Sequence, residues 1–482
     1  MASTTSLALR TGSLLLAIGT LAACGQGATS GDKNAQPSGS PTAASSQRKE
    51  VAGLDPRVLL TFDGGIMTVD TASGNVIATE KRDGFFRLNN AGDGRHVMVS
   101  DGNAFHLFDS GLIAQAHGDH FHYYTQNPAM TGASFAATEP GHVVTHRGKT
   151  ALFADGTGDI QVMNSGDLFA GKKPTAIDTT KTNAPHHGVA VPLKDGALLM
   201  TQGTESERHT VQVKDKSGAV IAETTDCPGV HGEAAAKPTD QGDVVALGCE
   251  NGPVVYRDGA FHKIKAQEAY QRSGNLVGSE ESEIVLGDYK TEGKKPEGEI
   301  ERPTRVALID TRADALKVVD LGSSYRFRSL ARGPHGEALV LTYDGELNVI
   351  DPVKGTVVRE TKVIEPWRED AQWQKPGPAL KVAGDFAYVT DAASKKLHIV
   401  DIEQGKIAKT INLPETPNEI AVVTGKPEAP APDTKDGGHA QHEHTGDHGD
   451  HEGHSHEGDG HEGDGHGSQE GHDHGGHEGH QH

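Results

Sequence analysis

Three imidazoles and a carboxylate lie within six residues of this 482-residue chain, in the segment His-Gly-Asp-His-Phe-His at residues 117–122. Imidazole nitrogen and carboxylate oxygen suit Zn²⁺ and its neighbours in the transition series, and structural zinc takes four such ligands. We therefore interpret His117, Asp119, His120 and His122 as candidate metal ligands. Successive side chains of an extended segment point to alternate sides, so we expect a closed site to need ligands from elsewhere. The alternative is a His-rich surface loop.

Two later segments repeat the histidine theme. They read Asn-Ala-Pro-His-His-Gly at residues 183–188 and Cys-Pro-Gly-Val-His-Gly-Glu at residues 227–233, which adds His186, His187 and His231 as candidates. For the His186-His187 pair, the alternative is the start of a strand with one ring buried. Histidines inside strand-like runs are assigned to packing or surface, namely His96, His106, His262 and His398. Four others stay unassigned, namely His142, His146, His209 and His335.

The elements that must position these residues are strands. Short apolar, often β-branched runs alternate with Gly, Asp, Asn and Pro, and helical periodicity is almost absent, which predicts an all-β fold. A unit of about four strands recurs at roughly 40 to 45 residues, the period of propeller blades. The clearest copies span residues 328–363, with strands at 337–343, 347–351 and 356–360, and residues 379–413, with strands at 386–391, 397–401 and 406–411. Fainter copies begin near Phe85, Ala133, His187, His231 and Gly274.

The two ends of this region complement each other. The first strands, at residues 58–62, 66–70 and 76–80, lack an inner strand, whereas residues 419–423 form a strand without the rest of its unit. Together they complete one unit, so we predict a single β-propeller of eight blades closed by the N- and C-terminal strands. A seven-bladed ring is the alternative if the region near Phe85, where the repeat pattern is weak, is divided into units differently. Tandem β-sandwich domains are the second choice of fold.

A propeller would bring the three His-bearing segments together. The connection from the outer strand of one blade to the inner strand of the next lies on the same face each time. We interpret all three segments as such connections of successive blades, so they should converge on one rim. We then expect His122, His187 and His231 to share an ion with Asp119 or Glu233.

The N-terminal residues predict export and a lipid anchor. Arg10 precedes an apolar run at residues 14–23 that is too short to span a bilayer. The following Leu-Ala-Ala-Cys-Gly resembles a bacterial lipobox, so residues 1–23 are interpreted as a lipoprotein signal and Cys24 as the lipidated residue. This places the protein on the outer face of the cytoplasmic membrane. The alternative is an ordinary secretory signal. Residues 24–50 are rich in Ser, Gly, Ala, Gln and Pro and are predicted to be a flexible tether.

The two remaining cysteines, Cys227 and Cys249, are expected to pair, because exported thiols tend to oxidise. The alternative is that both thiolates contribute to the metal site. No C-x-x-C pattern supports that alternative.

Charge and composition separate a globular body from a tail. The chain has a net charge of −22, which disfavours nucleic-acid binding because phosphate contact needs clustered Lys and Arg. Residues 426–482 contain 14 His and 14 Asp or Glu against two Lys, without a large apolar residue, so they cannot bury a core. We expect this tail to be disordered without metal and to hold weak metal sites at His439, His442, His444, His448, His451, His454, His456, His472 and His474. Residues 51–425 are the predicted propeller.

An exported propeller with His-Gly-Asp-His-x-His, His-His-Gly-Val-Ala and a His-rich segment resembles the AztD-type zinc metallochaperones over residues 51–425. The resemblance implies a periplasmic β-propeller that binds Zn²⁺ and hands it to the solute-binding protein of a zinc ABC importer. It carries over His117, Asp119, His120, His122, His186, His187 and His231 as ligands. The lipobox and the C-terminal place of the longest His-rich segment depart from the family pattern. We expect a monomer held at the membrane by its lipid.

Two other classes of function stay open. No G-x-S-x-G elbow, phosphate-binding Gly loop or dinucleotide motif is present, but a metal-dependent propeller hydrolase or lyase needs only an open coordination position and a base. A surface adhesion propeller with a metal-buffering tail is the third class. The Asp-Gly-Thr-Gly-Asp segment at residues 155–159 is interpreted as a hairpin turn rather than a calcium loop. Ni²⁺ and Cu²⁺ also bind imidazole, so the ligand types alone do not select zinc.

Overall fold

The structure is a computed structural model that describes residues 48–426 except 119, 170–174, 294 and 297. The predicted signal, Cys24 and the His-rich tail lie outside the described residues. Within the described part, no helix has the length and apolar character needed to cross a membrane. Apart from the short helix α1 (Ser165–Phe169) and two 3₁₀ turns at Lys194–Gly196 and Phe327–Ser329, the regular elements described are strands.

Eight of the described sheets have four antiparallel strands. In order of pairing, the first sheet consists of β35 (Ile420–Val423), β2 (Arg57–Phe62), β3 (Gly65–Asp70) and β4 (Asn75–Lys81), and the second of β5 (Arg87–Asn90), β6 (His96–Asp101), β7 (Ala104–Asp109) and β10 (Ala129–Ala136). The third consists of β11 (Pro140–His146), β12 (Lys149–Ala154), β13 (Asp159–Asn164) and β14 (Asp178–Lys181), and the fourth of β15 (Ala190–Pro192), β16 (Leu198–Gly203), β17 (Arg208–Lys214) and β18 (Val220–Thr224). The C-terminal strand β35 therefore completes the sheet of the first three body strands.

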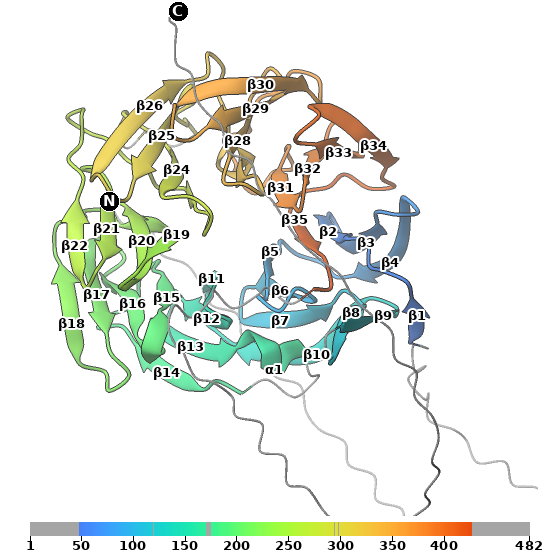
Figure 1. Cartoon of the computed structure of the whole chain (residues 1–482), viewed down its shortest axis with the longest axis horizontal. Helices are drawn as coiled ribbons and strands as arrows, with labels where there is room; N and C mark the ends of the chain where they lie inside the picture. The colour runs from blue at the N-terminus through green and yellow to red at the C-terminus, as the bar shows by residue number, and fades with distance from the viewer. Residues whose placement is uncertain (1–47, 119, 170–174, 294, 297, 427–482) are drawn as a thin grey trace, which may run out of the picture. The chain divides into compact units, whose positions relative to one another are not determined.

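The other four sheets follow in sequence order. They are β19 (His231–Thr239), β20 (Gly242–Gly248), β21 (Val254–Arg257), β22 (Ala260–Lys263); β23 (Leu276–Val277), β24 (Ile284–Asp288), β25 (Arg305–Asp310), β26 (Ala315–Asp320); β27 (Leu330–Arg332), β28 (Ala338–Leu341), β29 (Glu346–Asp351), β30 (Thr356–Lys362); and β31 (Leu380–Ala383), β32 (Phe386–Asp391), β33 (Lys396–Asp401), β34 (Lys406–Asn412). Figure 1 shows successive sheets placed around a common centre, with strands such as β5, β11 and β31 near it and β18, β26 and β30 at the periphery.

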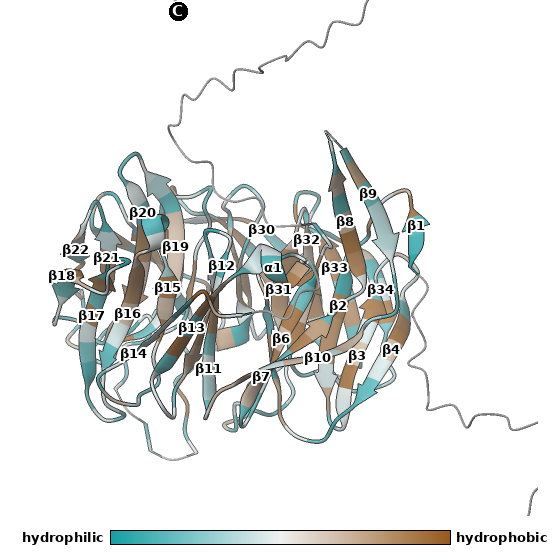
Figure 2. Cartoon of the chain, turned by 90° about the horizontal axis from the view of Figure 1, so that it is seen from below, coloured by the Kyte–Doolittle hydropathy of each residue, from teal (hydrophilic) through white to brown (hydrophobic). Residues whose placement is uncertain are grey.

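The core lies between neighbouring sheets. Val58 and Leu60 of β2 pack in one cluster with Tyr388 of β32, whereas Leu59 packs in another with Val97 of β6. A strand covered on both faces has consecutive apolar residues rather than an alternating pattern, which explains Val-Leu-Leu within the β2 sequence Arg-Val-Leu-Leu-Thr-Phe. Peripheral strands such as β4 instead alternate between exposed and half-buried residues, because one face meets water. Figure 2 shows the apolar residues concentrated along the strands.

The predicted strands of the clearest units agree with the structure within two residues, as in β29, β32 and β35. The unit predicted to begin near Ala133 is placed wrongly. Ala133 lies in β10, the outer strand of the preceding sheet, and the next sheet begins at Pro140. The cause is an insertion, because β8 (Leu112–His117) and β9 (His120–Thr125) come between the third and fourth strands of one sheet.

The inserted hairpin forms a ninth described sheet with β1 (Lys49–Val51), which pairs with β9. Lys49 and Glu50 therefore belong to a strand and not to the predicted tether. In Figure 2 the β8–β9 hairpin projects beyond the neighbouring strands.

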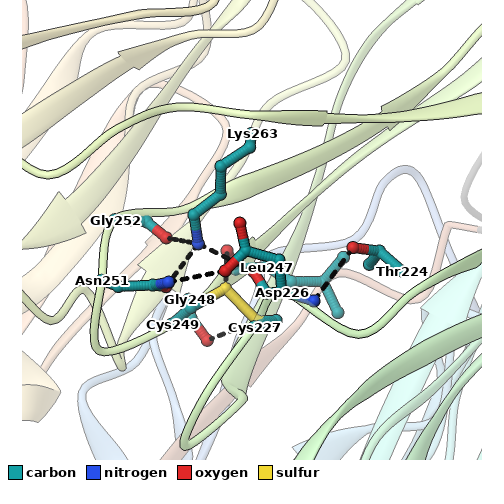
Figure 3. The surroundings of a disulfide bond; sticks show 9 residues. All are labelled: Thr224, Asp226, Cys227, Leu247, Gly248, Cys249, Asn251, Gly252 and Lys263. Carbon is teal, nitrogen blue, oxygen red and sulfur yellow. Dashed lines mark hydrogen bonds between the residues drawn. A yellow bond between two sulfur atoms is a disulfide. The ribbon is translucent and has the colours of Figure 1, made fainter.

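Cys227 and Cys249 form a disulfide, as predicted (Figure 3). Both side chains are fully buried, and Cys227 lies four residues before His231 in the segment that leads into β19. Close by, the Lys263 ammonium donates hydrogen bonds to the carbonyl oxygens of Asp226 and Gly252 at 2.9 and 2.8 Å. The disulfide thus ties the segment that leads to His231, a candidate ligand, to the end of β20 and the loop that follows it.

Candidate metal centres

The first group of imidazoles lies at the tip of the β8–β9 hairpin and consists of His117, His120 and His122, which we name the hairpin triad. His117 and His120 are directly paired across the two strands, and His122 follows His120 by two residues. Side chains at these positions share one face of a hairpin. Gly118 supports the tight turn with a φ of +60°, a conformation that glycine adopts without strain. One short segment therefore supplies three ligands on one side.

The geometry of the hairpin triad is open to water. His117 and His120 are exposed, and the His122 side chain is 40% exposed. The Nε2 atoms of His120 and His122 lie 3.3 Å apart, and the His122 Nδ1 hydrogen-bonds to the Glu50 carboxylate at 2.9 Å. The expectation that successive ring nitrogens in this segment point to opposite sides is wrong, because the turn makes His117 and His120 cross-strand neighbours. Asp119 lies outside the described residues.

The second group consists of His142, His187 and His231, which we name the cavity triad. His142 lies in β11, His187 just before β15, and His231 is the first residue of β19, so three consecutive sheets contribute one ring each. The candidate ligand atoms lie within 4.8 Å of one another and line a cavity of about 900 Å³. These residues are 45 and 44 positions apart in sequence, so the fold alone unites them.

The Nδ1 atom of each ring in the cavity triad already has an acceptor. The His142 Nδ1 donates to the Gly188 carbonyl at 2.9 Å, and the His231 Nδ1 donates to the Gly274 carbonyl at 2.5 Å. Carbonyl oxygen only accepts, so both rings carry their proton on Nδ1 and present an Nε2 lone pair. The His187 Nδ1 is held by Asp155 Oδ2 at 2.5 Å, the carboxylate–histidine pairing that orients metal ligands.

The three Nε2 atoms converge in a way that favours a cation between them. The His187 and His231 Nε2 atoms are 3.0 Å apart, a distance at which two lone pairs repel unless a proton or metal ion intervenes. Tetrahedral zinc with Zn–N bonds of 2.0–2.1 Å places its ligand nitrogens about 3.3 Å apart. The residues of both triads thus fit a zinc ion with three protein ligands.

Burial keeps two rings of the cavity triad, His142 and His231, neutral. Desolvation, aided by the charges of His187, His231 and Arg87, holds the pKa of His142 well below its usual value. Desolvation likewise lowers the pKa of His231 to about 3, with smaller contributions from His187, Arg272 and Arg208. A neutral imidazole is the form that binds metal, so these two rings are ready to coordinate at neutral pH.

The structure does not bring together all the residues predicted to share a site. His122 belongs to the hairpin triad and not to the group that contains His187 and His231. His186 is buried, with Nδ1 hydrogen-bonded to the Ala184 carbonyl at 3.0 Å and Nε2 to the Thr201 hydroxyl at 2.9 Å, which matches the alternative of one buried ring. Glu233 lines the cavity, and burial raises its pKa to about 8. It is not among the grouped ligands.

Sequence reasoning missed His142 and Asp155. His142 occupies the same place in its sheet as His187 and His231 do in theirs, at or just before the first strand. The misplaced unit boundary at Ala133 hid this equivalence. Asp155 does lie in the hairpin turn between β12 and β13, as predicted, and the pattern of a turn gives no sign that its carboxylate reaches His187.

The histidines assigned to packing or surface do have such partners. His96 is buried against Asp93 at 2.5 Å, His106 contacts Asp101 at 2.8 Å, and His398 contacts the Thr410 hydroxyl at 3.0 Å. None of these three belongs to either described metal group.

Comparison with known proteins connects this geometry to zinc. The chain is 27% identical over 404 residues to the zinc chaperone AztD of Citrobacter koseri, which covers 81% of this chain and 87% of the relative. The crystal structure of Citrobacter koseri AztD superposes with a TM-score of 0.65 at 25% identity, over 78% of this chain and 99% of that one. Apo AztD from the same organism gives a TM-score of 0.65 at 24% identity, over 78% and 100%. No family model matches the chain. The resemblance to the AztD-type zinc metallochaperones is therefore confirmed.

Proposed function

We propose that this protein is an extracytoplasmic metallochaperone that collects Zn²⁺ and transfers it to the solute-binding protein of a zinc ABC importer. The observation that carries the proposal is the convergence of the three imidazoles of the cavity triad, whose candidate ligand atoms lie within 4.8 Å of one another. The similarity to a protein named as a zinc chaperone supports zinc as the ion. Zinc is cargo in this proposal, and the protein acts by binding and release rather than as an enzyme.

The two triads suit different steps of such a function. The hairpin triad lies on a projecting tip, where a partner protein can approach and exchange ligands one at a time (Figure 2). The cavity triad is built from three sheets and held by fixed Nδ1 partners, so it loses little conformational entropy when it binds an ion. We assign exchange to the hairpin triad and retention to the cavity triad.

The fold proposed for this function is a closed propeller of eight blades. The eight four-stranded sheets and the pairing of β2 with β35 support it. Ring closure gives the cavity triad a rigid frame, because each blade packs between two others. Deletion of residues 418–426 should then lower the unfolding temperature of the whole body in one transition.

The ends of the chain supply a membrane anchor and added capacity in this proposal. Cys24 is the lipid attachment site, which keeps the protein, as a monomer, at the outer face of the cytoplasmic membrane. Incorporation of radiolabelled palmitate should be lost in Cys24→Ala. The His-rich tail holds further ions weakly in this proposal, since a segment that its composition predicts to be disordered loses roughly 1 to 2 kcal/mol for each residue that binding orders. Deletion of residues 436–482 should lower the number of ions bound and leave the tight site in place.

A transfer assay tests the proposed function directly. The zinc-loaded full-length protein is mixed with the purified solute-binding protein, and zinc arrival is followed by a change in intrinsic fluorescence of the acceptor. Direct transfer predicts a rate that rises with acceptor concentration and exceeds zinc loss to a small chelator of equal affinity. A rate equal to chelator-limited loss would show release into solution and would contradict the chaperone function.

A further inference from the structure

The cavity triad leaves one coordination position of a zinc ion unfilled. Zinc takes four ligands, and among the described residues no Cys, Asp or Glu joins His142, His187 and His231 in the group. The nearest carboxylate partner, Asp155, is engaged with His187 Nδ1 on the far side of the ring. The fourth ligand must therefore come from the cavity.

The cavity wall next to the triad carries Arg272. A Cβ atom on Gly274 would lie 2.9 Å from the Arg272 Nε and 3.4 Å from its Cζ, so the guanidinium lies against Gly274. The carbonyl of that glycine accepts the hydrogen bond from His231 Nδ1. The residue whose backbone carbonyl holds His231 in place is thus directly adjacent to the positive charge of Arg272.

The charge of Arg272 is not compensated by an ion pair with the residues that the structure describes, and its Nε is buried without a hydrogen-bond partner there. Its neighbour across an antiparallel bridge, Lys290, differs, because the Lys290 ammonium lies 3.7 Å from the Asp288 carboxylate. Arg87, which also lines the cavity, lies 3.3 Å from Glu419. Among the described residues, Arg272 is therefore the cation of this wall without a carboxylate within 4.0 Å, although its charge also acts on the buried Asp288.

A divalent ion in a cavity that also carries a guanidinium without a close ion pair is unfavourable, and an anion between them removes the conflict. A carboxylate can place one oxygen on zinc and offer the other to the planar donor fork of arginine. We propose that Arg272 holds a small carboxylate anion as the fourth ligand of a zinc ion on His142, His187 and His231. This inference rests on the proposed zinc site and adds a second ligand class to it.

The space fits a small organic anion. The cavity of about 900 Å³ adjoins a second cavity of about 620 Å³, and Arg272, Phe327 and Trp373 line both. An aliphatic acid can therefore direct its carboxylate toward the triad and leave its carbon atoms against the two aromatic rings.

The test uses Co²⁺ as a visible probe of coordination in the full-length protein loaded with one equivalent of the metal. Sodium acetate is titrated in, with sodium perchlorate at matched ionic strength as a non-coordinating control. A carboxylate that enters the coordination sphere changes the ligand-field absorption in a saturable way. The variants are Arg272→Gln, Arg272→Lys, His187→Ala and, as a charge-matched control on an exposed peripheral strand, Lys406→Gln.

We expect the wild type and Lys406→Gln to respond alike to acetate. Loss of a charge-assisted hydrogen bond should raise the acetate midpoint roughly ten- to a hundredfold in Arg272→Gln. Arg272→Lys keeps the positive charge but lacks the planar donor fork, so its acetate midpoint should lie between those of the wild type and Arg272→Gln. Equal thermal unfolding midpoints without metal show that the variants are folded. Unchanged acetate midpoints in both Arg272 variants, or a wild-type spectrum that does not respond up to about 100 mM acetate, would overturn the inference.

His187→Ala separates the inference from the function on which it rests. We expect this variant to lose the acetate-sensitive absorption. If instead it keeps the absorption unchanged, the ion does not lie on the cavity triad, and the proposed zinc site fails together with the inference. If only the dependence on Arg272 fails, the zinc site stands and the carboxylate ligand is wrong.

Discussion

The hairpin triad and the cavity triad use the same chemistry in different surroundings. Each has three imidazoles, and in each a carboxylate holds one Nδ1, Glu50 on His122 and Asp155 on His187. The Glu50 side chain is 61% exposed, whereas that of Asp155 is 17% exposed. Water and salt weaken the first contact, and burial strengthens the second. With the same ligand type in both triads, the roles proposed for them rest on environment.

The two triads also differ in how the chain builds them. The hairpin triad needs only one two-residue turn, so its ligands are close in sequence and their arrangement is local. The cavity triad needs three sheets to pack correctly before its rings meet. A site assembled by the whole fold is more rigid, and rigidity reduces the entropy lost on binding.

The largest effect should come from removing a ring. We expect His187→Ala to weaken the tightest zinc site by more than roughly a hundredfold, because loss of a ligand exceeds the 10–100-fold typical of a partner outside the coordination sphere. The matched change His120→Ala removes one ring of the hairpin triad and should leave the tightest site unchanged. Competition with a chelating dye measures both. The reverse ranking would make the hairpin triad the retention site.

The next effect comes from the carboxylate that holds His187. Asp155→Asn should weaken the tightest zinc site roughly 10- to 100-fold, because the amide no longer supplies a charged acceptor for His187 Nδ1. Asp159→Asn is the control, since Asp159 ends the same turn and its partner is Lys181 at 3.2 Å. Isothermal titration with a competing chelator reports the difference. Equal affinities in the two variants would show that Asp155 does not orient the ligand.

The sequence predicted most of the strands, all three rings of the hairpin triad and two of the three rings of the cavity triad, for a physical reason. Strand patterns are local, so β29, β32 and β35 are predicted within two residues. His187 and His231 were also found, because both lead into the first strand of a sheet. His142 was missed because the β8–β9 insertion shifted the apparent unit boundary to Ala133.

The contact between Asp155 and His187 could not be predicted, because it joins residues 32 positions apart across two sheets. The hairpin triad was predicted in composition but wrongly in position. Residues 117–122 belong to a hairpin whose turn makes His117 and His120 cross-strand neighbours. The sequence had suggested that this segment connects one sheet to the next.

The pH dependence of binding should separate the triads further. An imidazole in water titrates near 6.5, whereas burial lowers the pKa of His231 to about 3 and that of His142 well below its usual value. Protons therefore compete with zinc at these two rings only at lower pH. We expect zinc affinity to fall less between pH 7 and pH 5.5 in His120→Ala, which keeps the cavity triad, than in His187→Ala. Dye competition at each pH gives the change of zinc affinity with pH for each variant. An equal change in the two variants would contradict the role of burial.

Burial makes stability without metal more dependent on pH, although it makes zinc binding less so. The unfolded chain binds a proton at His231 near pH 6.5, and the folded chain does so only near 3. The unfolded state thus holds more protons between these values, so the free energy of unfolding falls as the pH is lowered from 6.5 toward 3. Chemical denaturation in chelator should show this loss, and His231→Gln should reduce it.

The smallest effect should come from Glu50. Its carboxylate accepts from His122 Nδ1 at 2.9 Å, the same contact that Asp155 makes with His187, but the Glu50 side chain is 61% exposed against 17% for Asp155. Exposed ion pairs contribute about 0.2 to 1 kcal/mol, so Glu50→Gln should weaken zinc at the hairpin triad by no more than roughly fivefold. The measurement is made in a His187→Ala background and repeated at high salt, where screening should abolish the difference. A loss as large as that of Asp155→Asn would show that exposure does not set the strength of the carboxylate contact, and the two triads would then differ only in access.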